Sequence, residues 1–84
     1  MATVVMYTTQ QCPYCLRAKA LLKHKQIPFQ EIDVTADAAL REKMVEESGQ
    51  RTVPQIFIDG KPIGGFDELR AMEAEGALDR LLGA

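Results

Sequence analysis

Cys12-Pro13-Tyr14-Cys15 is the stretch that decides the fold, because it holds the only two cysteines of this 84-residue chain with two residues between them. The apolar run Val4-Val5-Met6-Tyr7 precedes the motif and predicts a buried β-strand. The segment Leu16 to Lys25 follows it and has the apolar spacing of a helix. A Cys-x-x-Cys motif at the start of the first helix of a β-α-β unit is typical of a redox-active dithiol.

The size and charge of the chain exclude several classes of protein. Its 84 residues leave room for one small domain, which we take as residues 1–84. The net charge is −2, and no basic patch predicts a nucleic-acid partner. No apolar run approaches the roughly 18 residues that a membrane span needs, and the first residues lack the features of a signal peptide. We therefore expect a cytoplasmic monomer with no membrane partner, in a compartment where disulfides are usually transient and catalytic.

The pattern along the chain predicts a β-α-β-α-β-β-α order with a short C-terminal helix. The expected strands are 3–7, 29–34, 55–58 and 61–63, and Asp59-Gly60 predicts a tight hairpin between the last two. The proline at position 62 places the last strand at an edge of the sheet. The first β-α-β unit should be parallel, and the hairpin should extend the same sheet. This order predicts an α/β protein of the thioredoxin fold, with a four-stranded mixed sheet flanked by helices.

The helix boundaries follow from capping residues. The first helix should run from Pro13 to about Lys25, and the last turns should include Leu78, Leu81 and Leu82. Thr35 or Asp37 could cap the second helix, which should end at Gly49. Asp67 is expected to cap the third helix, which should end near Gly76.

The position of Cys12 at a helix N-terminus predicts its chemistry. The free N–H groups and the dipole at that end stabilise an anion, so the pKa of Cys12 should be lowered and its thiolate favoured. Pro13 suits the first helical position, where its missing N–H costs nothing. Cys15 lies one turn deeper on the inward face and should be less exposed. We therefore assign Cys12 as the nucleophile and Cys15 as the resolving thiol.

Half of a zinc site is the main structural alternative for the cysteine pair. Structural zinc needs about four ligands, and His24 is the only other soft candidate. His24 follows Cys12 by twelve positions on the same helix, which is about 18 Å along the axis. It cannot complete the site, so no metal is expected within one chain. A zinc ion shared by two chains stays an open alternative. A purely structural disulfide would close too small a loop to constrain the unfolded chain.

Three segments together resemble the dithiol glutaredoxins. The Cys12-Pro13-Tyr14-Cys15 motif is similar to that family's active site, Thr52-Val53-Pro54 to its Thr-Val-Pro loop, and Gly64-Gly65-Phe66-Asp67 to its Gly-Gly-x-Asp segment. Their order and spacing also match over essentially the whole chain. The resemblance implies a glutathione-dependent thiol-disulfide oxidoreductase that reduces glutathione mixed disulfides and protein disulfides.

The resemblance also implies a set of glutathione-binding residues. Val53 would pair its backbone with the cysteinyl part of glutathione, beside Thr52 and before a cis Pro54. Gly65 would allow the backbone to come close to the bound glutathione, and Asp67 would contact its γ-glutamyl end. The complete set implied for glutathione consists of Gln11, Tyr14, Arg51, Thr52, Val53, Pro54, Gly65, Phe66 and Asp67. Within it, Tyr14 would flank the tripeptide, Phe66 would form an apolar wall beside the γ-glutamyl end, and Arg51 would meet the glycyl carboxylate.

The chain departs from the family just before the motif. Many relatives carry a lysine there that helps bind glutathione and favours the thiolate, whereas this chain has Thr8-Thr9-Gln10-Gln11. Gln11 can offer a hydrogen bond but no charge. Phe66 stands where several relatives have a smaller residue or a third cysteine.

The implied partners are glutathione, proteins that carry glutathione or disulfides, and an NADPH-dependent glutathione reductase that acts indirectly through glutathione. Glutathione would be a cosubstrate, with no cofactor tightly bound. Two alternatives remain open. One is a redoxin reduced directly by thioredoxin reductase. The Gly64-Gly65-Phe66-Asp67 segment argues against it, and the missing lysine keeps it open. The other is a carrier in which two chains share an iron–sulfur cluster, against which Pro13 argues.

Overall fold

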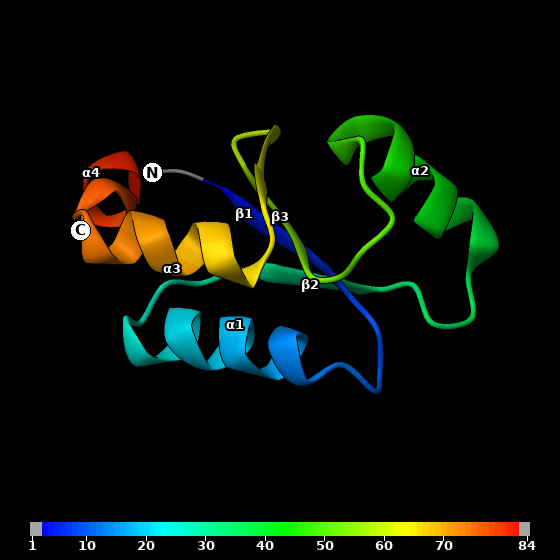
Figure 1. The fold of residues 1–84 in the computed structure, drawn as a ribbon, viewed down its shortest axis with the longest axis horizontal. Coiled ribbons are helices and arrows are strands. Elements are labelled where there is room, and N and C mark those ends of the chain that lie inside the picture. The colour runs from blue at the N-terminus through cyan, green and yellow to red at the C-terminus, as the bar shows by residue number, and fades with distance from the viewer. Residues whose placement is uncertain (1–2, 83–84) are drawn as a thin grey trace.

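The computed structural model describes residues 3–82 and has the expected order of elements (Figure 1). The strands are β1 (Val4–Thr8), β2 (Gln30–Asp33), β3 (Gln55–Ile58) and β4 (Lys61–Gly64). The helices are α1 (Pro13–His24), α2 (Ala38–Ser48), α3 (Phe66–Ala74) and α4 (Ala77–Leu82). The ends of most elements differ by only one or two residues from those predicted. The small differences at strand ends arise because pairing with the neighbouring strand decides where each strand begins and ends.

The four strands form one mixed sheet in the order β2-β1-β3-β4. β1 pairs in parallel with β2 and antiparallel with β3, and β3 pairs antiparallel with β4. The central strand β1 is buried at four of its five positions, as its continuous apolar run predicted. Pro62 lies in β4 at the edge of the sheet, where its missing N–H leaves no central ladder position unpaired.

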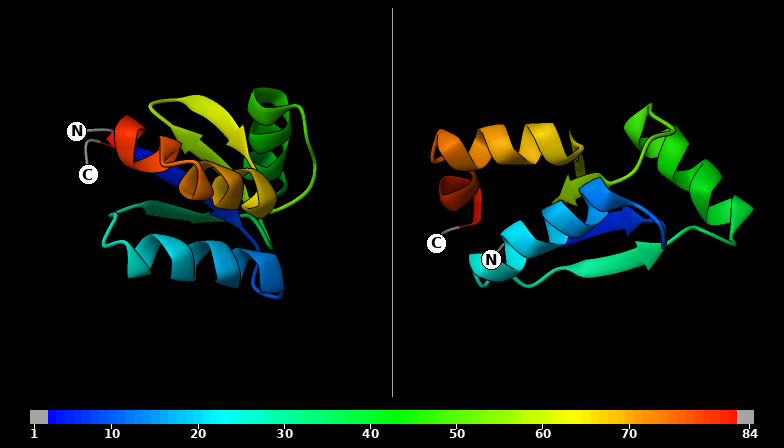
Figure 2. Two further views of the ribbon diagram at one scale, coloured as in Figure 1. Left: turned by 60° about the vertical axis from the view of Figure 1, so that its left-hand side comes forward. Right: turned by 60° about the horizontal axis from the view of Figure 1, so that its bottom comes forward.

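The two faces of the sheet are covered by different helices (Figure 2). On one face α1, α3 and α4 enclose a core whose buried members are Val4, Met6, Ala18, Leu22, Ile27, Ile56, Ile58, Leu69 and Leu78. On the other face α2 packs through Met44 against Tyr7, Val34 and Phe57. Because α1 and α3 lie side by side on the same face, their N-terminal ends can contribute to one site. No helix within residues 3–82 is long and apolar enough to cross a membrane.

Local capping and turn signals behave largely as the sequence predicted. Asp59 and Gly60 have φ values of 52° and 80°, as a type I′ hairpin requires. Asp37, not Thr35, caps α2 by accepting a hydrogen bond from the Leu40 N–H at 3.0 Å. Gly49 ends α2 in the left-handed conformation with φ 75°.

The prediction that Asp67 caps the third helix is wrong. Gly65 is the N-cap of α3, so Asp67 lies inside the first turn. Glu68 explains the shift, because its Oε1 accepts a hydrogen bond from the Gly65 N–H at 2.7 Å. A carboxylate three residues after the N-cap thereby fixes the start of the helix, as in one half of a capping box.

A carboxylate joins three elements on one side of the sheet. Glu31 of β2 accepts a hydrogen bond from the buried Thr8 hydroxyl at 2.7 Å, and the same Oε2 lies 3.0 Å from Lys19 Nζ of α1. The hydrogen bond from Thr8, followed by that from Lys19, lowers the pKa of the Glu31 carboxyl below its usual value. The ionised form of Glu31 is therefore favoured by folding.

Glu31→Gln is expected to lower the free energy of unfolding by about 1 kcal/mol at neutral pH, a small value because the Glu31 side chain is 38% exposed and screened. A depressed pKa in the folded state contributes stability above the unfolded pKa, and this is lost as pH falls through the folded value. The unfolding curves of variant and wild type should therefore converge under acid conditions. Glu46→Gln, which changes an exposed carboxylate of α2, is the control. An equal deficit at every pH would contradict the role given to the Glu31 charge.

Candidate active site

The two cysteines lie at the N-terminus of α1 and form a disulfide, with their Cα atoms 5.1 Å apart. Cys12 is the N-cap, and its Sγ accepts the Cys15 N–H at 3.0 Å. Cys12 is 8% exposed and Cys15 is 1% exposed, so the outer and inner members of the pair are those that the sequence predicted. The N–H aimed at Cys12 Sγ favours negative charge on that sulfur when the disulfide is reduced.

The loop between α2 and β3 brings its backbone next to the outer cysteine. The Val53–Pro54 peptide bond is cis, as the family resemblance implied. The Val53 carbonyl oxygen lies 3.7 Å from Cys12 Sγ, which carries no hydrogen in the disulfide and therefore only contacts it. The backbone at Val53 thus faces the position at which a disulfide partner of Cys12 would be attached.

The start of α3 forms the opposite wall of the site. At Gly65 a Cβ atom would lie 3.3 Å from the Pro54 carbonyl oxygen, so a glycine allows α3 to approach the loop closely. Asp67 and Glu68 place two carboxyl groups in the first turn. The Gly65 N–H donates to Glu68. The N–H groups that follow it in the first turn have no partner within the helix, so they can bind an anion.

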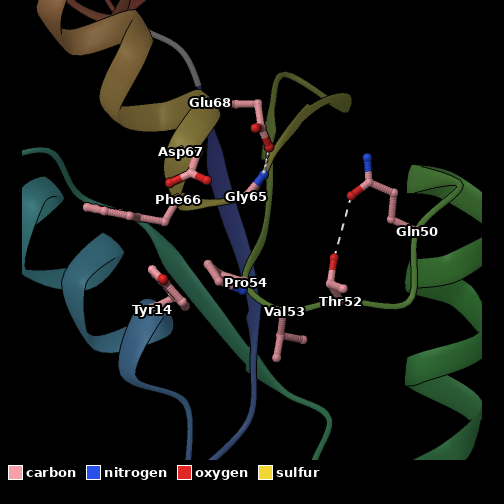
Figure 3. Close-up of a pocket in the computed structure, with 9 residues that line it drawn as sticks. All are labelled: Tyr14, Gln50, Thr52, Val53, Pro54, Gly65, Phe66, Asp67 and Glu68. Carbon is pink, nitrogen blue, oxygen red and sulfur yellow. Dashed lines mark hydrogen bonds between the residues drawn. The ribbon is translucent and has the colours of Figure 1, made fainter.

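A cavity of about 240 Å³ lies between these elements. Figure 3 shows Tyr14 from α1, Pro54 from the loop, and Phe66 and Asp67 from α3 arranged around it. The complete lining consists of Tyr14, Gln50, Thr52, Val53, Pro54, Gly65, Phe66, Asp67 and Glu68. The N-terminus of α3 and the loop backbone at Val53 therefore meet next to the redox pair.

Two aromatic rings form the apolar side of the cavity. The ring centroids of Tyr14 and Phe66 lie 6.1 Å apart with an angle of 36° between the planes. The guanidinium carbon of Arg17 lies 5.2 Å from the Tyr14 centroid, on the next turn of α1. Although Tyr14 is 53% exposed, these two contacts restrain its ring at the rim of the cavity.

Gln11 and Arg51 lie outside the lining. Gln11 is exposed in the loop before Cys12, and Arg51 Nη1 lies 3.6 Å from Glu42 Oε1 of α2. The roles that the resemblance implied for these two residues stay predictions. Among residues 3–82, no group of three or more His, Cys, Asp or Glu side chains is arranged to hold a metal ion.

Gln50 and Glu68 line the cavity but were not singled out from the sequence. A glutamate three residues after a glycine could have indicated the capping contact of Glu68. No sequence signal pointed to Gln50, because its position depends on how the loop leaves α2.

The family model named Glutaredoxin matches residues 4–63, which is more than half of the chain. This chain belongs to the glutaredoxin family. Over 82 residues it is 56% identical to glutaredoxin 3 of Escherichia coli strain K12, covering 98% of this chain and 99% of that protein. It is 49% identical over 84 residues to a glutaredoxin of Pseudomonas aeruginosa, with complete coverage of both chains.

Solved glutaredoxin structures have the same fold. The crystal structure of a buckwheat glutaredoxin–glutathione complex matches with a TM-score of 0.89 and 32% identity, over 98% of this chain and 77% of that one. The solution structure of a glutaredoxin from Brucella melitensis matches with a TM-score of 0.86 and 54% identity, over 98% and 89% of the two chains. The thioredoxin fold with a four-stranded mixed sheet, predicted from the sequence, is confirmed.

Glutaredoxins are thiol-disulfide oxidoreductases that use glutathione as a cosubstrate. As a glutaredoxin with both cysteines of the motif in a disulfide, this chain is a glutathione-dependent thiol-disulfide oxidoreductase. The predictions of the family, the enzyme class and the reaction are therefore confirmed.

Proposed function

We propose that this glutaredoxin reduces glutathione mixed disulfides with Cys12 as nucleophile, and protein disulfides with Cys15 as the resolving thiol. One observation carries the assignment: Cys12 Sγ is the N-cap atom that accepts the Cys15 N–H, and it lies next to the open loop backbone at Val53. The outer sulfur therefore has both the stabilised charge and the access that an attacking thiolate needs.

The reaction begins when the Cys12 thiolate attacks the glutathionyl sulfur of a mixed disulfide. A bond forms between Cys12 and glutathione, the original disulfide breaks, and the substrate leaves as a thiolate that takes up a proton. The thiolate of a second glutathione then attacks the bound glutathionyl sulfur, which releases oxidised glutathione and restores the Cys12 thiolate.

Protein disulfides are reduced by a second branch that uses both cysteines. Cys12 forms a mixed disulfide with the protein, and the Cys15 thiolate attacks Cys12 Sγ to release the reduced protein. Two glutathiones then reduce the Cys12–Cys15 disulfide, and an NADPH-dependent reductase recycles the oxidised glutathione. A sulfur stabilised as a thiolate is also a good leaving group, which speeds the steps that expel Cys12.

The residues around the cavity suit a ligand that has both a carboxylate and an ammonium group at one end. The first N–H groups of α3 favour a carboxylate, and the Asp67 carboxylate beside them favours an ammonium group. The γ-glutamyl end of glutathione carries both groups on one carbon. In this proposal Val53 pairs with the cysteinyl part, and Tyr14 and Phe66 flank the tripeptide.

We further propose where and in what form the enzyme works. Residues 1–84 act as one catalytic unit, glutathione is exchanged in each cycle without being tightly held, and the enzyme works as a cytoplasmic monomer. Gln11 contributes a hydrogen bond and Arg51 meets the glycyl carboxylate after rotating away from Glu42, from which it is separated by 3.6 Å.

Turnover of the mixed disulfide of glutathione and cysteine tests the proposed function. The assay couples the enzyme to glutathione, glutathione reductase and NADPH, and a parallel assay replaces both glutathione and its reductase by thioredoxin reductase. Turnover in the first assay alone is the expected result. Turnover in the second assay alone would show that thioredoxin reductase serves this redoxin directly and would overturn the proposal.

Asp67→Asn tests the binding of the γ-glutamyl end. The substitution keeps the shape of the side chain and removes the charge that would attract the ammonium group, so KM for the mixed disulfide should rise about tenfold with little change in kcat. Steady-state kinetics check this, with Glu46→Gln of α2 as a charge-matched control. An unchanged KM would show that Asp67 does not contact the substrate.

A further inference from the structure

A buried glutamine directly follows the cis proline of the active-site loop. Gln55 is the first residue of β3 and is only 1% exposed. Among the residues that the structure describes, only Thr8 and Gln55 are polar and buried. Burying a side-chain amide is unfavourable unless its groups are bonded, so the partners of Gln55 indicate what this side chain does.

All the hydrogen-bond acceptors that Gln55 contacts belong to the loop before the proline. Its Nε2 lies 2.9 Å from the Thr52 carbonyl oxygen, 3.1 Å from Thr52 Oγ1 and 3.3 Å from Gln50 Oε1. A carbonyl oxygen only accepts hydrogen bonds, so the nitrogen of the Gln55 amide must be the atom that faces the loop. Its two hydrogens are shared among three oxygens.

The loop that Gln55 holds is the one that faces the cysteine pair. Thr52 and Val53 line the cavity, and the Val53 carbonyl oxygen lies 3.7 Å from Cys12 Sγ. Figure 3 shows Gln50, Thr52 and Val53 following one another along this loop, with the contact between Gln50 and Thr52 drawn as a dashed line. Because Gln55 bonds the carbonyl of Thr52, it fixes one end of the peptide unit that leads into Val53.

We propose that Gln55 is a positioning residue of the active site, which holds Thr52 and Val53 in the conformation that pairs with the cysteinyl part of glutathione. This inference rests on the proposed function. A loop that is ordered before binding lowers the entropic cost of binding. Loss of the Gln55 amide therefore weakens binding of the glutathionyl group and leaves the chemistry at the sulfur atoms largely unchanged.

Gln55→Met is the first test, because methionine has a similar length and no hydrogen-bond donor. KM for the mixed disulfide of glutathione and cysteine should rise about tenfold, which corresponds to about 1.4 kcal/mol, with kcat within about twofold of wild type. Leu78→Val is the matched control, since it loosens the core at α4 far along the chain from the loop. An unchanged KM in Gln55→Met, or an equal rise in Leu78→Val, would overturn the proposal.

Gln55→Glu is the second test, because it turns the contact into a pH-dependent one. When neutral, the introduced carboxyl can donate one hydrogen bond to the Thr52 carbonyl oxygen; when ionised, it presents only acceptors to the oxygens of the loop. Burial raises the pKa of a carboxyl group, so KM should approach the wild-type value at low pH and rise as pH increases. A ratio of variant to wild-type KM that stays constant with pH would contradict the positioning role.

Wild-type enzyme assayed at each pH distinguishes failure of the proposed function from failure of the role given to Gln55. An inactive wild type would overturn the proposed function and the inference that rests on it. An active wild type with unaffected Gln55 variants would overturn the inference alone.

Discussion

Cys12→Ser is expected to lower turnover of glutathione mixed disulfides by at least about a thousandfold, because the substitution removes the sulfur that we propose as the nucleophile. A hydroxyl group at this N-cap could still accept the Cys15 N–H that Cys12 Sγ accepts at 3.0 Å, so the helix should remain capped. It cannot ionise near neutral pH or form a disulfide with glutathione. The loss should therefore occur without loss of the fold.

Turnover in the assay coupled to glutathione reductase measures this effect, and thermal unfolding of the reduced proteins checks the fold. A second readout is the covalent adduct with glutathione. Reduced wild type incubated with oxidised glutathione should form either an adduct with one glutathionyl group or the internal disulfide. Mass spectrometry should detect one of these products in wild type and neither in Cys12→Ser. Substantial activity of Cys12→Ser would show that Cys15 is the nucleophile and that the roles are reversed.

The parts of the fold that local rules govern could be predicted from the sequence. Positive φ at Asp59 and Gly60, the Asp37 cap and the Gly49 stop each depend on a few adjacent residues. The position of Cys12 at the N-cap follows in the same way, because Pro13 fits the first turn. These local rules were enough to predict that the redox pair lies at the N-terminus of α1, without any knowledge of the tertiary structure.

The start of α3 shows where local rules compete. N-cap statistics rank aspartate above glycine, which favoured Asp67. In the structure Glu68 reaches back to the Gly65 N–H, and Gly65 lies so close to Pro54 that a larger residue would crowd the loop. The contact between α3 and the loop, which is not local, therefore decides where the helix begins.

The residues that line the cavity or support its loop could be predicted only in part for the same reason. Val53 and Asp67 were implied by the family resemblance, because that resemblance carries tertiary information. Gln50 and Gln55 carried no signal, since their side chains meet only after the loop folds back toward β3. Arg51 is directed to Glu42 on α2, and its contact with glutathione stays a prediction.

Cys15→Ser is expected to separate the two reactions of the enzyme. The mixed-disulfide reaction needs only Cys12 and free glutathione, so its turnover should stay within about threefold of wild type. Reduction of a protein disulfide needs a second thiol to release the protein from Cys12. With the two Cα atoms 5.1 Å apart, Cys15 attacks within one molecule, and its loss should slow this reaction at least about a hundredfold.

Paired assays of one variant preparation check the separation, with the glutathione–cysteine mixed disulfide and insulin disulfides as the two substrates. Since both assays use the same Cys12, a damaged nucleophile or a misfolded variant would lower both rates together. A fall only in the protein-disulfide rate identifies Cys15 as the resolving thiol. If the insulin assay were unaffected, glutathione itself would be releasing the protein from Cys12, and the buried position of Cys15, only 1% exposed, would have to be explained by packing alone.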